Sequence, residues 1–238
     1  MSGEQATATE GGQPSRIQVP ADPLAGHPAT AYFWGHVAGS GDVAADRLAV
    51  VTTDEASARV LAAVAGGDVE RDGTRREYAH DRSITRSEDE YTLSITPGDS
   101  AGLLGRNSVL GLPVDGRGNY RFDAFAGHDR ELLRGLFEGC GTICFKSSSG
   151  TVGVSFVHDD PALLEFGRAL IVECPVAAPT GDLSETASGG YWFGVDDSRA
   201  PAFGRWLYED CEETGLFAPS RRRKLERSLS QADAYDET

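Results

Sequence analysis

Hydrophobic and polar positions follow the same succession of periods twice along the chain. In each half, a glycine-containing segment of helical periodicity runs into an apolar β-rich stretch, as in LRGLFEGCG (133–141) followed by TVGVSFV (151–157). Acidic residues then open a second segment of helical periodicity, and a further strand and a final helix follow. The pattern predicts, in each half, the order helix, two strands, helix, one or two strands, helix.

The two halves are related by a constant offset. FWGHVAGSG (33–41) and LRGLFEGCG (133–141) share the spacing G-x-x-x-G-x-G, and each glycine of the first recurs 100 positions later in the second. The later strands of the two halves begin at tyrosines with the same offset, Tyr91 and Tyr191. A repeat of this length indicates a duplicated domain rather than a solenoid.

The chain accordingly divides into four parts. We assign residues 29–120 to the first repeat and residues 121–227 to the second. Residues 1–28 are rich in Gly, Thr, Gln and Pro without hydrophobic periodicity, so we expect a disordered N-terminal tail. Residues 228–238 are polar, and we expect a loose C-terminal tail.

Glycines one turn apart in both predicted helices require a physical reason, because glycine inside a helix costs roughly 1 kcal/mol relative to alanine. Glycines at i and i+4 clear one side of a helix and let a second backbone approach it closely. The last glycine of each segment ends the helix and lets the chain turn into a strand. The spacing therefore predicts that the two helices pack against each other through Gly35, Gly39, Gly135 and Gly139.

This duplicated arrangement resembles the LAGLIDADG homing-endonuclease family over roughly residues 30–227. Segments 33–41 and 133–141 stand at the two motif positions of that family. The resemblance implies a monomer with an α/β (α+β) fold, in which two pseudo-symmetric αββαββα repeats pack through their motif helices. It also implies that the two sheets form a saddle over double-stranded DNA.

The motif positions depart from the family at the residues that carry its chemistry. In the family, a catalytic carboxylate immediately precedes the final glycine of each motif, whereas this chain has Ser40 and Cys140 there. Neither supplies the anionic oxygen that Mg²⁺ prefers, so we predict no catalytic residue, no metal site and no cofactor. The nearest remaining acids are Glu138 and Asp42. Mg²⁺ becomes relevant only if these two carboxylates lie close enough to bridge a metal ion and so retain residual endonuclease activity.

One stretch concentrates arginine, VERDGTRREYAHDRSITR (69–86), and we expect it to form a β-hairpin of the saddle. Arginine on a two-stranded ribbon can read guanine edges or clamp phosphates. The acids between the arginines support an alternative of equal weight, a solvated hairpin held by ion pairs. The candidate DNA-binding residues are Arg71, Arg75, Arg76, Arg82 and Arg86.

A second basic cluster lies near the end of the predicted fold, where the resemblance implies proximity to the DNA backbone. Its members are Arg221, Arg222, Arg223, Lys224 and Arg227, of which the first four are candidate DNA-binding residues. Cations at this place also suit a helix dipole, so a purely structural role is the alternative. Lys146, on the strand after the second motif, is a further candidate for the saddle face.

The charge balance changes how these cations are judged. The chain has 37 acidic and 22 basic residues, a net charge of -15, and only two lysines. Acid excess with few lysines resembles the proteins of salt-accumulating haloarchaea, so the net charge does not exclude nucleic acid. No apolar run approaches the length of a membrane span, and the N-terminus lacks the pattern of a signal peptide. We therefore expect a cytoplasmic protein without a membrane partner.

These observations favour a nuclease-dead LAGLIDADG-like protein that acts as a DNA-binding or regulatory factor. A bacterial sporulation regulator with a degenerate LAGLIDADG domain is a precedent in kind. The alternative is an accessory role without nucleic acid, with cobalamin biosynthesis as one setting that no residue of the chain indicates. DNA binding requires the arginines of 71–86 and the basic end to line one concave face, whereas an accessory role predicts acids on it.

Overall fold

The computed structural model describes residues 17–78, 81–96, 103–104, 106–113 and 118–236, and within these ranges the side chains of 73–78, 81–88, 107–108 and 236 lie outside the description. The first half contains one helix–strand–strand–helix–hairpin unit. Its elements are α1 (Pro28–Ser40), β1 (Gly41–Val43), β2 (Leu48–Thr52), α2 (Glu55–Ala65), β3 (Val69–Tyr78), β4 (Asp81–Ile95) and α3 (Arg106–Val109). The strands form an antiparallel sheet in the order β1-β2-β4-β3.

The second half repeats this order and then continues into further helices. Its elements are η1 (Asp123–Phe125), α4 (Asp129–Cys140), β5 (Gly141–Lys146), β6 (Thr151–His158), α5 (Pro161–Glu173), β7 (Ser184–Glu185), β8 (Tyr191–Val195), α6 (Ala200–Leu207), α7 (Cys211–Thr214) and α8 (Pro219–Asp236). The sheet is again antiparallel, in the order β5-β6-β8-β7. The α/β fold of two pseudo-symmetric repeats predicted from the sequence is thereby confirmed.

Local sequence signals explain where the second helix of each repeat begins. The Asp54 side chain caps α2 by accepting a hydrogen bond from the Ala56 backbone N–H at 3.0 Å. Asp160 caps α5 in the same way through Ala162, and Pro161 occupies the first helical position, where its fixed φ suits a helix start. Each of these aspartates follows a strand, so it marks the point at which the chain leaves the strand and the next helix begins.

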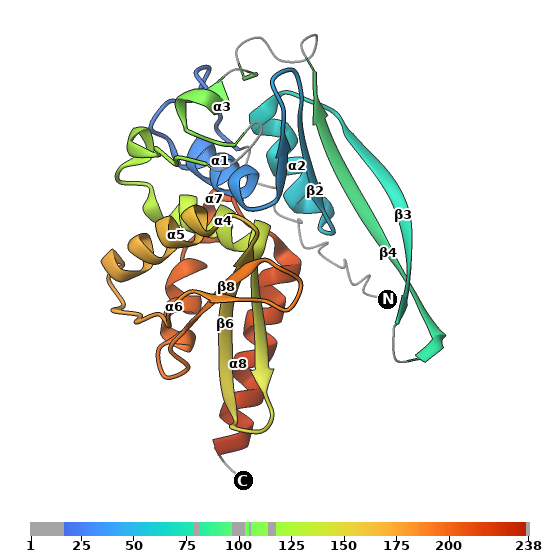
Figure 1. The fold of residues 1–238 in the computed structure, drawn as a ribbon, viewed down its shortest axis with the longest axis vertical. Helices are drawn as coiled ribbons and strands as arrows, with labels where there is room; N and C mark the ends of the chain where they lie inside the picture. The colour runs from blue at the N-terminus through green and yellow to red at the C-terminus, as the bar shows by residue number, and fades with distance from the viewer. Residues whose placement is uncertain (1–16, 79–80, 97–102, 105, 114–117, 237–238) are drawn as a thin grey trace, which may run out of the picture.

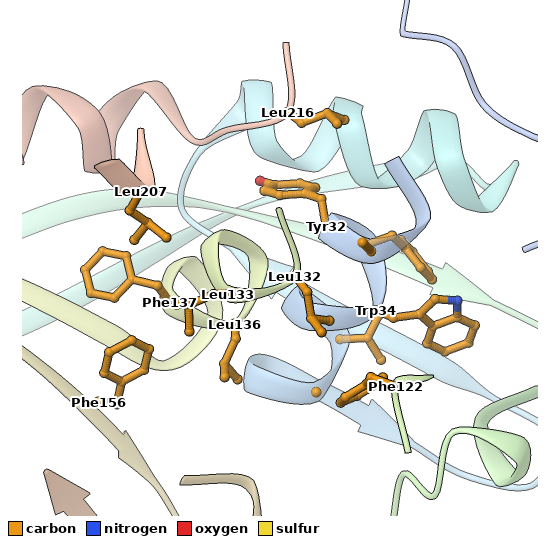
Figure 2. Close-up of a cluster of buried hydrophobic side chains, with 14 of the residues drawn as sticks. Tyr32, Trp34, Phe122, Leu132, Leu133, Leu136, Phe137, Phe156, Leu207 and Leu216 are labelled. Carbon is orange, nitrogen blue, oxygen red and sulfur yellow. The ribbon is translucent and has the colours of Figure 1, made fainter. Parts of the chain in front are cut away.

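The core is centred on α1 and α4, which cross in direct backbone contact (Figure 2). A Cβ at Gly35 would lie 2.1 Å from the carbonyl oxygen of Leu132, and one at Gly135 would lie 2.0 Å from that of Tyr32. Residues 29–39 of α1 are all buried. Only glycine permits this approach, so the two halves share one core around the helix pair.

The β3–β4 hairpin is the longest element of the first sheet and projects from the body as a curved arm (Figure 1). Only Tyr91–Ile95 of β4 pair with β2, so most of the hairpin is a two-stranded ribbon. In the second half of the molecule, α8 lies along β5, which is an edge strand of the second sheet. None of the described helices is long and apolar enough to cross a bilayer.

The two ends of the chain differ from the sequence-based prediction. Of the predicted disordered tail, residues 1–16 lie outside the described part, but Ile17 and Leu24 pack on the core and Pro23 accepts a hydrogen bond from the Trp34 indole. The predicted loose tail from residue 228 instead continues α8 to Asp236. The segment is polar overall, but Ser228, Leu229 and Ala232 recur at helical spacing and pack inward, so one face of the helix is buried.

Candidate functional site

The last residues of the two glycine-containing helices are neutral. Ser40 ends α1, and its hydroxyl lies 3.0 Å from Nδ1 of His36 and donates to the His36 carbonyl oxygen at 3.2 Å. Cys140 ends α4, and burial raises the pKa of its thiol to about 12. Neither side chain therefore offers an anionic ligand at neutral pH.

The two remaining acids near the motifs face different surroundings. Glu138 is buried: its Oε1 accepts a hydrogen bond from the Ala218 backbone N–H at 2.8 Å and its Oε2 accepts one from the Tyr32 hydroxyl at 2.5 Å. Asp42 is exposed on β1 and forms an ion pair with Arg47. Within the described residues, no group of three or more His, Cys, Asp or Glu side chains is placed to hold a metal ion.

Glu138 belongs to a buried chain of polar contacts that crosses both glycine-containing helices. The Tyr32 hydroxyl lies 3.3 Å from the Ser57 hydroxyl, which lies 3.4 Å from Nε2 of His36. Nδ1 of the same imidazole contacts Ser40. Burial lowers the pKa of His36 to about 4, so the ring is neutral at pH 7. The chain therefore joins the two degenerate motifs through neutral groups, with Glu138 as its only acid.

Glu138 gives the fold a testable pH dependence. Burial raises its pKa from 4.5 to about 7, against the opposing effect of the Ala218 hydrogen bond. The folded state then binds a proton at Glu138 more tightly than the unfolded chain, so the contribution of Glu138 to stability is fully present below pH 4.5 and is lost as pH rises through about 7. We expect the stability difference between the wild type and Glu138→Gln to fall by about 3 kcal/mol over this range. Urea unfolding of both proteins across pH measures it, and a constant difference would contradict the prediction.

The arginine-rich stretch forms the β3–β4 hairpin, as predicted. Arg71 is exposed and donates to Asp89 at 2.7 Å, and this ion pair raises its pKa. Its register partner is Tyr91, whose side chain is buried, so Arg71 shares the face of the sheet that α2 covers. Arg75 and Arg76 lie on β3 and Arg82 and Arg86 on β4, with side chains outside the described part. The DNA-binding role of these four arginines stays a prediction.

The open face of the first sheet carries acids where it is described. Because side chains alternate along a strand, the Glu90 side chain lies on the face of the sheet opposite to that of the buried Tyr91 and Leu93. Asp72 is the register partner of Glu90, and Glu70 that of Thr92, so Glu70, Asp72 and Glu90 share the face that the helices leave open. Among the described residues, three acids therefore stand on the open face at the base of the hairpin.

The basic end is divided among different environments. Arg222 pairs with Glu212 and Glu226 and lies 5.7 Å from the centre of the Phe217 ring, which indicates a structural role. Lys224 Nζ lies 3.5 Å from the Thr142 hydroxyl of β5. Arg223 is exposed, whereas Arg221 is half-buried.

The open face of the second sheet is mostly uncharged. Lys146 is held by both carboxylate oxygens of Asp197 at 2.7 and 2.8 Å. Val157 and Trp192 are register partners on neighbouring strands and remain 46% and 42% exposed. This pair therefore lies on the solvent-exposed face of the sheet and is not part of the core.

Comparison with known proteins identifies the architecture. Residues 10–235 match the LAGLIDADG family described as "Putative archaeal homing endonuclease". The chain belongs to this family. No curated protein is similar to it in sequence.

Solved LAGLIDADG structures share the fold at low identity. The homing endonuclease I-WcaI bound to its DNA recognition sequence is 10% identical with a TM-score of 0.52, covering 84% of this chain and 87% of that one. I-DmoI in complex with DNA and Ca is 13% identical with a TM-score of 0.48, covering 84% and 97%. Full-length DUF199/WhiA from "Thermatoga maritima" is 10% identical with a TM-score of 0.46, covering 89% and 64%. This chain thus spans less than two thirds of that WhiA protein.

Sequence reasoning missed the buried polar residues of this LAGLIDADG chain. Tyr32 and His36 precede and overlap the first motif at helical i, i+4 spacing, so they project from one side of α1. That spacing, together with their polar groups in an otherwise apolar segment, was the available signal. Their partner Ser57 gives no sequence signal, because it lies in a different helix.

Proposed function

We propose that this LAGLIDADG-family chain binds duplex DNA without cutting it. The observation that carries the proposal is the β3–β4 ribbon, which extends well beyond its sheet and brings arginines from both strands together. A two-stranded ribbon fits the major groove, where arginine reads guanine or contacts phosphate. The DNA-bound state of I-WcaI, which has the same fold, supports this choice of partner.

The absence of cleavage follows from the motif ends. Hydrolysis of a phosphodiester by this fold requires carboxylates that position metal-bound water. Here the two motif positions hold a serine hydroxyl and a neutral thiol, and the nearest acid, Glu138, already accepts two hydrogen bonds. The same interface can therefore be retained for recognition while the reaction is lost.

The hairpin arginines give the direct test. Replacing Arg75, Arg76 and Arg82 together by alanine should weaken duplex binding on the order of 100-fold or more, because each charge-assisted contact contributes roughly 1–3 kcal/mol. Binding to a randomised duplex pool, with and without Mg²⁺ and at low and high KCl, measures affinity, and sequencing of the retained DNA detects a motif or cuts. The salt slope should also fall by about 0.9 for each lost phosphate contact.

A matched control removes the same charge elsewhere. Arg59, Arg199 and Arg205 are exposed outside the hairpin and outside the basic cluster, and their alanine substitution should change affinity little. If the control variant lost as much DNA affinity as the hairpin variant, net charge alone would explain the effect of the hairpin substitutions. Cut products would show that Ser40 and Cys140 do not abolish catalysis, and no retention at any salt concentration would reject DNA as the partner.

The second candidate is a protein-binding accessory role. It is favoured by the acids Glu70 and Asp72 on the open face of the first sheet, and by the exposed Val157–Trp192 pair on the second. Acids repel a phosphate backbone and favour a basic surface. Failure of DNA retention with intact folding would make this role the leading one.

A further inference from the structure

A small cavity lies at the junction of the two halves, beside the end of α4 and the start of α8. Its volume is about 170 Å³, below the roughly 300–1,000 Å³ of small-molecule pockets, so it accommodates one compact group. The first half contributes the end of β2 and the residues before α2. Polar lining residues include Thr52, Thr53, Asp54, Glu138, Ser220 and Arg221.

The carboxylates of the cavity are already engaged. Asp54 accepts hydrogen bonds from the backbone of Ala56 and Ser57 through Oδ1, and from the Ser220 backbone at 2.7 Å through Oδ2. It therefore caps two helices at once, and their N-terminal dipoles offset its charge. Glu138 accepts its two hydrogen bonds as described, and Glu90, which also lines the cavity, is not free either.

Hydrogen-bond donors in the cavity are less occupied. The Arg221 guanidinium forms no ion pair or side-chain hydrogen bond with the described residues. Its charge lowers the pKa of both His36 and Cys140, which places it near both motif helices. Thr52 uses its hydroxyl oxygen to accept from the Asp54 backbone, so its hydroxyl proton is available.

We infer that this cavity binds one oxyanion of the phosphate class, with Arg221 as the charged donor and the neighbouring hydroxyls of Thr52, Thr53 and Ser220 as neutral donors. A guanidinium without an ion pair among the described residues and three hydroxyl-bearing residues line one cavity of this size, which matches the size and charge of such a group. The anion can be a free phosphate or a backbone phosphate of DNA. The second source rests on the proposed function, whereas the cavity itself does not.

Titration with inorganic phosphate tests the site directly. Binding to the wild type, Arg221→Ala and Arg227→Ala is followed by ³¹P NMR line width, with circular dichroism confirming the fold. Arg227 is exposed on the same helix and has no ion pair with the described residues, so it controls for charge. We expect Arg221→Ala to weaken phosphate binding about tenfold or more and Arg227→Ala to leave it unchanged. No binding to the wild type, or an equal effect of both variants, would overturn the inference.

Duplex DNA supplies the second arm of the test. If phosphate binds through Arg221 and Arg221→Ala also weakens duplex binding, the source is the DNA backbone. If phosphate binds through Arg221 but no duplex is retained, the site stands with free phosphate as its ligand and the proposed function fails. If the hairpin triple variant loses DNA while Arg221→Ala changes neither phosphate nor DNA binding, the function stands and this inference fails.

Discussion

Replacing Gly135 by alanine should destabilise the protein by about 3 kcal/mol or more. The added Cβ would lie 2.0 Å from the carbonyl oxygen of Tyr32 and 2.8 Å from the backbone nitrogen of His36. Both are backbone atoms of a buried helix, so relief requires α1 and α4 to separate. Alanine gains roughly 1 kcal/mol of helix propensity, which is smaller than the cost of overpacking and of opening the shared core. Chemical or thermal unfolding measures the difference.

Gly167 supplies the matched control. It also lies inside a helix, α5, but a Cβ there would meet only the end of the Leu136 side chain at 3.2 Å. A flexible side chain can move by this amount, so Gly167→Ala should stay within about 1 kcal/mol of the wild type, in either direction. Equal stability of Gly135→Ala and Gly167→Ala would mean that the motif helices are further apart than described here.

The close helix packing could be predicted because glycine leaves a direct record in the sequence. The same G-x-x-x-G-x-G spacing at a constant offset identifies both helices and their common face. The hairpin was likewise predictable from its position before Tyr91. The direction of Arg71 was also encoded, since period-2 alternation places it on the face opposite Glu70 and Asp72. A stretch counted as one basic patch therefore contains charges of both signs on different faces.

The adjacent cations at residues 221–224 lie in different environments, which their closeness in sequence does not reveal. Consecutive residues on an α-helix point about 100° apart, so four adjacent cations cannot share one surface. Arg222 turns toward Glu212 and Glu226, whereas Arg221 lines the central cavity and Arg223 is exposed. Once the extent of α8 is known, this division follows from geometry.

Contacts between distant segments could not be predicted at all. Glu138 looks like a remnant of the motif's acids, but its carboxylate is satisfied by the Ala218 backbone, 80 residues later. Nothing in the local sequence identifies that partner, and the pKa of Glu138 is raised by burial, which also depends on the tertiary fold. The chemistry of the site is thus decided by how the end of the chain returns to the motif helices.

Arg134 is the strongest example of such a return and leads to the second large effect. Its side chain is 1% exposed, and its guanidinium donates to the carbonyl oxygens of Leu207 at 2.6 Å and Leu216 at 3.0 Å. The guanidinium also donates a third hydrogen bond, to the Glu209 carbonyl oxygen at 3.5 Å. One buried cation of α4 therefore fixes the segment that connects α6 to α8.

Replacing Arg134 by methionine keeps the aliphatic stem but leaves these carbonyls without donors. We expect the free energy of unfolding to fall by about 3–5 kcal/mol, because the buried carbonyl oxygens lose their donors and the buried Glu131, 4.0 Å away, loses a compensating charge. Arg130→Met on the same helix is the control. Arg130 pairs with the exposed Glu209 and Asp210 and, at 3.6 Å, with Glu131, which also pairs with Arg134, so its loss should cost less than about 2 kcal/mol. Urea unfolding compares the two.

Titration of Glu138 provides a readout that a general loss of packing would not move. The positive charge of Arg134 lowers the pKa of Glu138, in opposition to the larger effect of burial. Removing that charge should therefore raise the Glu138 pKa further above about 7, and the loss of stability with rising pH should shift to higher pH. Carbon-13 NMR of the labelled carboxyl measures this pKa in Arg134→Met and Arg130→Met. An unchanged Glu138 pKa in Arg134→Met, or a small stability loss equal to that of Arg130→Met, would show that Arg134 does not connect the motif helix to the end of the chain.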